Sequence, residues 1–247
     1  MSNSSAARPL PVITSLLPRE VLRATWALFQ LSWPTCLPLA LVGVTASGVP
    51  GAEAAAAGAA RGLSHDPQWW ALYVVSMVLT LACYGAVVLR QRSIADGEPI
   101  PILDALRRSV MGLPTTATTA VLCSLSVAVG GVLLVLPGLA ALVLFSLAWI
   151  IALEGATPID AMRKSAAAIC GRFWAMAKLL AVLLSAVLVF VVLAGIFVGV
   201  LMAVAGKQGP TSIVGQTLSR LLFGTVIALP VAWLGAALVV LRRYLQS

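Results

Sequence analysis

Six long apolar runs constrain this chain more than any other feature of its sequence. A helix needs about 20 apolar residues to cross a bilayer, because its backbone polar groups must be satisfied within the segment. The runs that meet or approach this length cover roughly residues 26–48, 69–89, 113–136, 138–153, 174–204 and 218–241. We therefore expect an all-α polytopic membrane protein with six transmembrane helices, forming a single integral membrane domain over residues 1–247.

The overall composition agrees with lipid as the main solvent of the chain. Hydrophobic residues make up 61% of it and charged residues 10%, whereas about a quarter of the residues of soluble proteins are charged. The mean hydropathy is +1.04 and the net charge is +8. Because the basic residues stand at the ends of apolar runs and form no dense tract, we expect anionic membrane lipid as their partner and no nucleic acid.

The basic residues are distributed unevenly between the two sides of the predicted membrane. If both termini are cytoplasmic, thirteen of the 16 Lys and Arg residues lie on the inner side, and only Arg61, Lys207 and Arg220 lie outside. This bias follows the positive-inside rule. It predicts a multi-pass protein of the bacterial cytoplasmic (inner) membrane, with the N-terminus and the C-terminus in the cytoplasm.

The third and fourth apolar runs are separated only by Pro137-Gly138. This dipeptide suits the two central positions of a type II turn, because Pro fixes its own φ and Gly accepts a positive φ. We therefore predict a tight helical hairpin that turns at these two residues.

A short polar motif recurs three times along the chain. It reads Pro, one or two residues, an acid, a small apolar residue, Leu or Met, Arg, any residue, and Ser or Thr, and its copies begin at Pro18, Pro101 and Pro158. The second and third copies also follow an acid–Gly pair, Asp96-Gly97 and Glu154-Gly155. We interpret the motif as an internal repeat of one surface helix followed by a membrane hairpin. Ordinary basic cytoplasmic loops are the alternative interpretation.

Local chemistry predicts a helix end and then a helix start in the third copy. Gly155 can adopt the left-handed conformation that ends a helix. Thr157 is then a candidate N-cap, Pro158 takes the first helical position, and Asp160 lies near the positive end of the helix dipole. By analogy we expect interfacial helices at roughly 18–30, 100–112 and 158–172, the first of which can run straight into the first membrane helix.

Projection at 100° per residue makes the second and third copies amphipathic. The apolar faces gather Ile102, Leu106, Val110 and Leu113 in one copy and Ile159, Met162, Ala166, Ile169 and Phe173 in the other. Amphipathic helices with basic residues on or beside the polar face are typical of membrane surfaces. The candidate contacts to lipid headgroups or to a protein partner are Arg107, Arg108, Arg163, Lys164 and Arg172.

The sequence offers little material for a catalytic or metal site. His65 is the only histidine, which makes paired-His metal sites and Ser-His-Asp hydrolysis hard to build. The cysteines form no CxxC pair and are far apart, so neither a zinc site nor a disulfide framework is predicted; they are Cys36, Cys83, Cys123 and Cys170. We expect no enzyme, no cofactor and no metal.

Three ionisable residues fall within or at the ends of the predicted membrane helices. Glu154, Lys178 and Arg220 are candidates for an intramembrane polar site, because ionisable groups at that depth are functional by default. All three can instead reach an interface by extending their side chains, which is the interpretation we favour. Hydroxyl groups at membrane depth are few, and they belong to Ser124, Ser126, Ser146, Ser185 and Thr225.

The stretch from Leu133 to Leu180 carries a family likeness in Pro137-Gly138, Glu154-Gly155, Pro158, Ala161, Arg163, Ser165 and Phe173-Trp174. In these residues it resembles a group of bacterial six-helix membrane proteins, mostly uncharacterised, that includes the membrane domain attached to some glycerophosphodiester phosphodiesterases. The resemblance implies a six-helix fold and little chemistry. We expect no phosphodiesterase domain, since the apolar helices occupy most of the 247 residues.

These observations favour a non-catalytic inner-membrane scaffold or complex subunit, in envelope or lipid homeostasis. Its basic amphipathic helices would contact anionic lipid or a cytoplasmic partner, and a protein partner or homo-oligomer is compatible with the sequence. The alternative is a small-molecule or lipid transporter with a cavity between the helix repeats.

Overall fold

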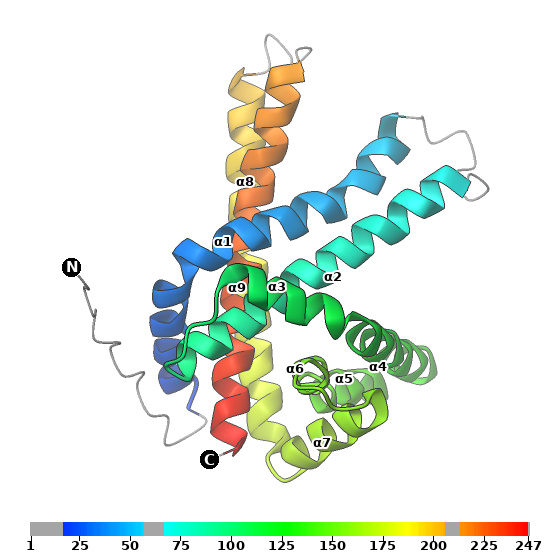
Figure 1. Ribbon diagram of the computed structural model, residues 1–247, viewed down its shortest axis with the longest axis vertical. Helices are drawn as coiled ribbons and strands as arrows, with labels where there is room; N and C mark the ends of the chain where they lie inside the picture. Colours follow the sequence, from blue (N-terminus) through cyan, green and yellow to red (C-terminus); the bar gives the residue numbers. More distant parts are fainter. Residues whose placement is uncertain (1–16, 57–66, 206–212, 247) are drawn as a thin grey trace.

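The computed structural model describes residues 17–56, 67–205 and 213–246, and the regular elements in them are helices (Figure 1). Six spans are long and apolar enough to cross a membrane, so the chain is an all-α polytopic membrane protein. The helices are α1 (Pro18–Ala56), α2 (Pro67–Ala95), α3 (Ile102–Met111), α4 (Leu113–Leu133), α5 (Val135–Leu144), α6 (Ala148–Leu153), α7 (Pro158–Cys170), α8 (Phe173–Ala205) and α9 (Ile213–Gln246).

Two long helical hairpins dominate the shape of the molecule. Helices α1 and α2 form one hairpin, α8 and α9 form the other, and the two diverge from a shared base (Figure 1). Helices α3 to α7 pack beside this base. The arrangement therefore has one end where most elements meet and an opposite end where the hairpins stand apart.

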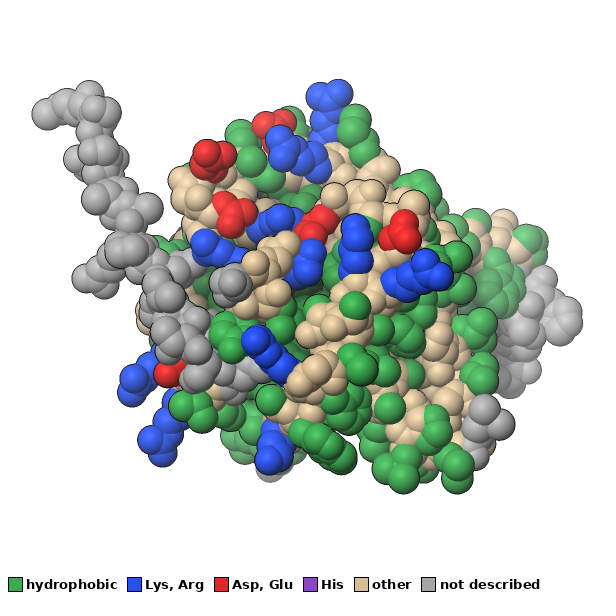
Figure 2. All heavy atoms as spheres, turned by 90° about the horizontal axis from the view of Figure 1, so that it is seen from below, with side chains coloured by type: hydrophobic (Ala, Val, Ile, Leu, Met, Phe, Trp, Pro, Cys, Tyr) green, Lys and Arg blue, Asp and Glu red, His purple; other side chains and the backbone are tan. Residues whose placement is uncertain are grey.

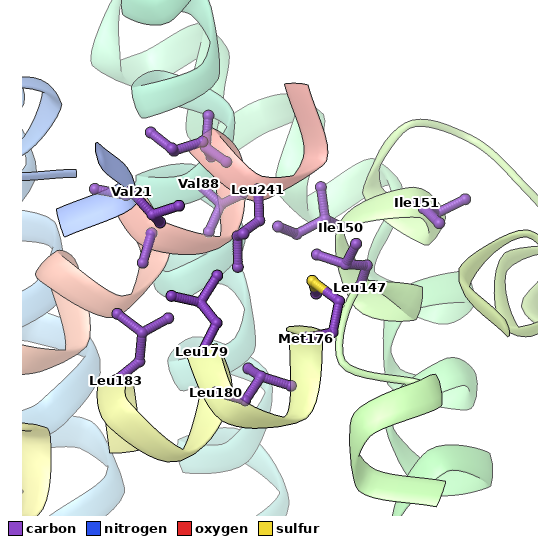
Figure 3. Close-up of a cluster of buried hydrophobic side chains, with 14 of the residues drawn as sticks. Val21, Val88, Leu147, Ile150, Ile151, Met176, Leu179, Leu180, Leu183 and Leu241 are labelled. Atoms are coloured by element: carbon purple, nitrogen blue, oxygen red, sulfur yellow. The ribbon is translucent and has the colours of Figure 1, made fainter. Parts of the chain in front are cut away.

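The main hydrophobic core lies at the shared base. Val21 at the start of α1 and Met176 at the start of α8 meet Leu241 near the end of α9 (Figure 3). Ile150 and Leu147 reach the same cluster from α6 and the turn that precedes it (Figure 3). These side chains are at most 2% exposed, so this end of the molecule contains a fully buried hydrophobic core.

Helix α1 absorbs the first expected interfacial segment, 18–30, and continues without interruption into the first membrane span. Pro34 and Pro38 lie inside it, and the helix changes direction part-way along (Figure 1). A proline in a helix removes a backbone donor and clashes with the preceding turn, which bends the helix. Thr35 donates to the carbonyl of Ser32 at 3.0 Å, beside the two prolines.

The predicted turn at Pro137-Gly138 is wrong. Helices α4 and α5 are joined by the single extended residue Leu134, with φ −164° and ψ 142°, and the dipeptide lies in the first turn of α5. A proline is tolerated there because the first backbone N–H groups of a helix have no partner within it. Gly138 serves helix packing instead, since a Cβ on it would lie 2.7 Å from the backbone nitrogen of Gly131.

The fourth apolar run is divided, although we expected it to be one helix over 138–153. Helix α5 ends at Leu144 and α6 begins at Ala148, with a turn between them. The hydroxyl of Ser165, in α7, donates to the carbonyl of Leu144 at 2.6 Å. A side chain from another helix thus satisfies the backbone where the membrane helix breaks.

The two short helices α3 and α7 lie within the ranges where interfacial helices were expected, 100–112 and 158–172. The predicted start of α7 is confirmed: Gly155 has a φ of +93°, and Thr157 accepts a hydrogen bond from the backbone N–H of Asp160 at 3.3 Å. Gly97, the glycine of the other acid–Gly pair, has a φ of +82° between α2 and α3. A left-handed glycine therefore ends the preceding helix in both copies.

Candidate functional site

Helices α3 and α7 each bury a narrow stripe of small residues against the rest of the protein. Ala105 and Ser109 in α3 are 0% and 2% exposed, and Ala161 and Ser165 in α7 are both 0% exposed. A spacing of four places the two residues of each pair on one face of the helix. The small residue and the hydroxyl of the repeated motif are thus the positions that let each short helix pack closely.

The first copy of the motif, inside α1, has the same pattern of burial. Val21 and Thr25 are both 0% exposed, whereas Arg23, the motif arginine, is exposed. The acids of the second and third copies, Asp104 and Asp160, are exposed as well. All three copies therefore place the small residue and the hydroxyl inside and the arginine outside.

The five cations proposed as headgroup or partner contacts are all exposed, and none forms an ion pair within the part of the chain that the structure describes. They are Arg107, Arg108, Arg163, Lys164 and Arg172. Arg172 also lies over the ring of Tyr244, 5.3 Å from its centroid. The view onto the base of the molecule shows basic and acidic side chains gathered on this face (Figure 2).

Large apolar side chains are exposed on the same two helices. Leu103 and Met111 of α3 are 75% and 66% exposed, and Ile159 of α7 is 65% exposed. An exposed apolar side next to exposed cations is the surface expected of a helix that lies along a bilayer. The buried side of α7 also includes Ile169, whereas Leu103, Met111 and Ile159 remain exposed and available to lipid.

A second charged group joins three helix ends. Glu154, directly after α6, accepts hydrogen bonds from Arg242 of α9 at 2.8 and 3.2 Å and pairs with Arg92 of α2 at 2.8 Å. Glu154 and Arg242 are each only 15% exposed. The carboxylate thus ties α6 to both neighbouring hairpins through short, charge-assisted contacts.

Asp96 belongs to the same charged group, but its contacts are longer than those of Glu154. Its carboxylate lies 3.6 Å from Arg92 and 3.7 Å from Arg243, and Arg243 also donates to the carbonyl of Ala95. Asp96 and Arg243 are nearly half exposed. We refer to the five residues Arg92, Asp96, Glu154, Arg242 and Arg243 as the arginine clasp. A hollow of roughly 230 Å³ lies beside them.

Helix dipoles explain why the clasp contains more arginine than acid. The C-terminal ends of α2, α6 and α9 converge on it, and each brings a partial negative charge. Three guanidinium groups near these ends offset both the dipoles and the two carboxylates. The clasp is therefore close to neutral as a whole, and we assign it to holding the helix ends together.

The structure describes the side chains of two of the three residues proposed for an intramembrane polar site. Glu154 belongs to the clasp, Lys178 is exposed, and Arg220 lies in a part of α9 whose side chains are outside the described residues. The arginines that bind Glu154 were missed as site residues, because the sequence identified them only as bases at helix ends. The two acid–Gly pairs of the sequence could have indicated this site, because their acids, Asp96 and Glu154, both belong to the clasp.

Gln91, which is next to Arg92 in the sequence, makes a buried polar contact that no sequence pattern predicted. Gln91 of α2 is 0% exposed, and its amide donates to the carbonyl of Ala232 at 2.8 Å and to the hydroxyl of Ser32 at 3.5 Å. The space for it comes from Gly235, where a Cβ would lie 2.8 Å from the amide oxygen. Gln91 therefore links α1, α2 and α9 at one point.

Four of the five hydroxyl residues that a transporter cavity could use have described side chains, and none of these four donates a hydrogen bond to another helix. Ser126 and Ser146 donate to carbonyls of the preceding turn, those of Leu122 and Val143, and Ser124 and Ser185 are exposed. Thr225 and His65 are outside the residues whose side chains are described. Within the described residues, no group of three or more potential metal ligands is present.

No family model matches the chain, and neither the curated proteins nor the solved structures include a significant match. The resemblance to the six-helix family related to phosphodiesterase membrane domains therefore stays a prediction.

Proposed function

We propose that this multi-pass membrane protein is a non-catalytic scaffold or complex subunit of the bacterial inner membrane, in envelope or lipid homeostasis, whose helices α3 and α7 contact anionic lipid. One observation carries the proposal: both helices expose cations beside large apolar side chains while a stripe of small residues fixes them to the bundle. This geometry suits a rigid platform lying in the headgroup layer.

The electrostatic part of the proposal follows from the exposed cations. A basic residue near an anionic membrane surface contributes about 1 kcal/mol of attraction. Arg107 and Arg108 on α3, with Arg163 and Lys164 on α7, supply four such charges. The same charges support a cytoplasmic location for this face, and hence for both termini, through the positive-inside rule.

Lipid selectivity in nanodiscs tests this proposal. We expect spin-labelled phosphatidylglycerol to associate with the protein more strongly than spin-labelled phosphatidylcholine. Changing the four residues Arg107, Arg108, Arg163 and Lys164 to Gln should reduce this preference, because the change removes only exposed charge and leaves the buried stripes of the fold untouched.

A matched control changes the net charge of the same two helices in the opposite direction. The double variant Asp104→Asn and Asp160→Asn removes two exposed acids and should increase the preference for phosphatidylglycerol. Lipid selectivity that is the same in the wild-type chain and in both variants would refute the lipid-contact role of α3 and α7. Loss of a co-purifying protein from the four-residue variant, with lipid selectivity unchanged, would assign the surface to a protein partner instead.

A further inference from the structure

An apolar groove runs between the two long hairpins, at a different place from α3 and α7. It has a volume of roughly 370 Å³ and is lined by apolar side chains of α1, α8 and α9, among them Trp26, Phe190, Pro230 and Trp233. Trp26 and Phe190 are 53% and 41% exposed. The groove is therefore open at the surface of the molecule, and its walls come from membrane-spanning helices.

The position of the groove along the helices places it in hydrocarbon. Trp26 is seven residues from Arg19 in α1, and Trp233 is nine residues from Arg242 in α9. At 1.5 Å per residue these separations are about 10.5 and 13.5 Å. If the cations mark the headgroup layer, the groove lies at the depth of lipid acyl chains.

Two cations stand above one wall of this groove. Arg19, Arg23 and Trp26 follow each other at spacings of four and three residues, which places them on one face of α1, and all three are exposed. Neither arginine forms an ion pair within the described residues. The nearby acid Glu20, three residues before Arg23, is half-buried.

We propose that the groove is a specific site for an anionic phospholipid, with one acyl chain between Trp26, Phe190 and Trp233 and the phosphate bound by Arg19 and Arg23. The apolar lining selects a hydrocarbon chain, and the two guanidinium groups select a headgroup with net negative charge over a zwitterionic one. Pro230 shapes the wall on α9, because a proline within a helix opens its backbone on one side.

Quenching of tryptophan fluorescence tests the site directly. The full chain, with Trp233 retained and the other tryptophans changed to Phe, is reconstituted with lipids brominated on the acyl chain. We expect brominated phosphatidylglycerol to quench Trp233 more strongly than brominated phosphatidylcholine. The changes Arg19→Gln and Arg23→Gln should each reduce the preference about fivefold, the factor equivalent to the roughly 1 kcal/mol of one basic residue at an anionic surface.

Two controls separate this site from general lipid contact. A chain that retains only Trp70, which is 48% exposed at the start of α2, should be quenched equally by both lipids. The changes Arg107→Gln and Arg163→Gln should leave the preference at Trp233 intact, so the groove and the proposed role of α3 and α7 can fail separately.

Native mass spectrometry gives a second readout on the chain with all its tryptophans. We expect phosphatidylglycerol to remain bound through delipidation in the wild-type chain and to be lost in the Arg19→Gln and Arg23→Gln double variant. Equal quenching of Trp233 by both lipids, or a preference that survives the two arginine changes, would overturn the proposal. Protection of Trp233 from both lipids, with a dimer in the mass spectrum, would assign the groove to a second copy of the chain.

Discussion

The two ends of this molecule are held together in different ways. At the shared base, the main core and the arginine clasp join α2, α6 and α9 with buried side chains and ion pairs. Toward the opposite end the hairpins diverge (Figure 1), and the membrane span of α8 is only 17% buried, against 50% for that of α9. Among the described residues, the ion pairs thus lie at the base, while the other half faces largely lipid.

The properties of the bilayer account for this difference. Lipid chains are as apolar as leucine, so there is no hydrophobic gain when apolar helices come together within the hydrocarbon core. Helices there associate through close packing of small residues or through hydrogen bonds. The diverging hairpins are therefore compatible with a stable membrane protein, and the clasp supplies specific contacts where three helix ends meet.

Removing the central carboxylate of the clasp should have the largest effect on stability. The change Glu154→Gln leaves Arg242, which is 15% exposed, with its counter-charge removed. Breaking a buried ion pair by removing one partner costs about 3 kcal/mol. We expect a loss of this size in the free energy of unfolding, measured by titration with a denaturing detergent in mixed micelles.

The matched control is Asp96→Asn, in the looser part of the same clasp. Asp96 is 47% exposed and its contacts are 3.6 and 3.7 Å long, so its loss should cost below about 1 kcal/mol. Equal destabilisation by the two changes would contradict the role that we assign to Glu154.

The hairpin of α4 and α5 tests close packing away from the clasp. In Gly138→Ala the new methyl group would lie 2.7 Å from the backbone of Gly131, so the helices must separate. Overpacking of this kind costs about 2 kcal/mol. The same unfolding titration should show this loss.

Gly131→Ala is the control for that change, because a Cβ on Gly131 would meet no atom within 4 Å. It should be neutral or should stabilise the protein by about 0.5 kcal/mol, since alanine favours helix more than glycine does. A destabilisation by Gly131→Ala as large as that of Gly138→Ala would show that the hairpin does not depend on backbone contact at Gly138.

The hydroxyl of the repeated motif should have the smallest effect. Ser165→Ala removes the hydrogen bond to the carbonyl of Leu144, at the break between α5 and α6, and should cost about 1 kcal/mol. Ser126→Ala is the control, because that hydroxyl bonds only to its own helix. Identical unfolding curves for Ser165→Ala and the wild-type chain would indicate that the motif hydroxyl serves close packing alone.

Local chemistry predicted those parts of the fold that depend on a few consecutive residues. The apolar runs indicated the membrane helices, because length and composition suffice to span a bilayer. Gly155 and Thr157 indicated the end of one helix and the start of the next, since a positive φ and an N-cap are properties of single positions. Pro137-Gly138 misled us because a proline is accepted equally well in a turn and in the first turn of a helix.

Contacts between distant residues could not be predicted in the same way. Glu154 and Arg242 are 88 residues apart, and Gln91 and Ala232 are 141 apart. No spacing rule relates such pairs, and their side chains are ordinary for the ends of membrane helices. The break at Leu144 was missed for the same reason, because the residue that satisfies its carbonyl belongs to another helix.

The side of the membrane that α7 faces tests the central claim most directly. Cys170, the last residue of α7, is exposed, and a chain with the other three cysteines changed to Ala keeps it as the sole thiol. An impermeant maleimide should label Cys170 in inverted inner-membrane vesicles and leave it unlabelled in intact spheroplasts. Labelling in spheroplasts would place the basic face outside the cytoplasm and contradict the account.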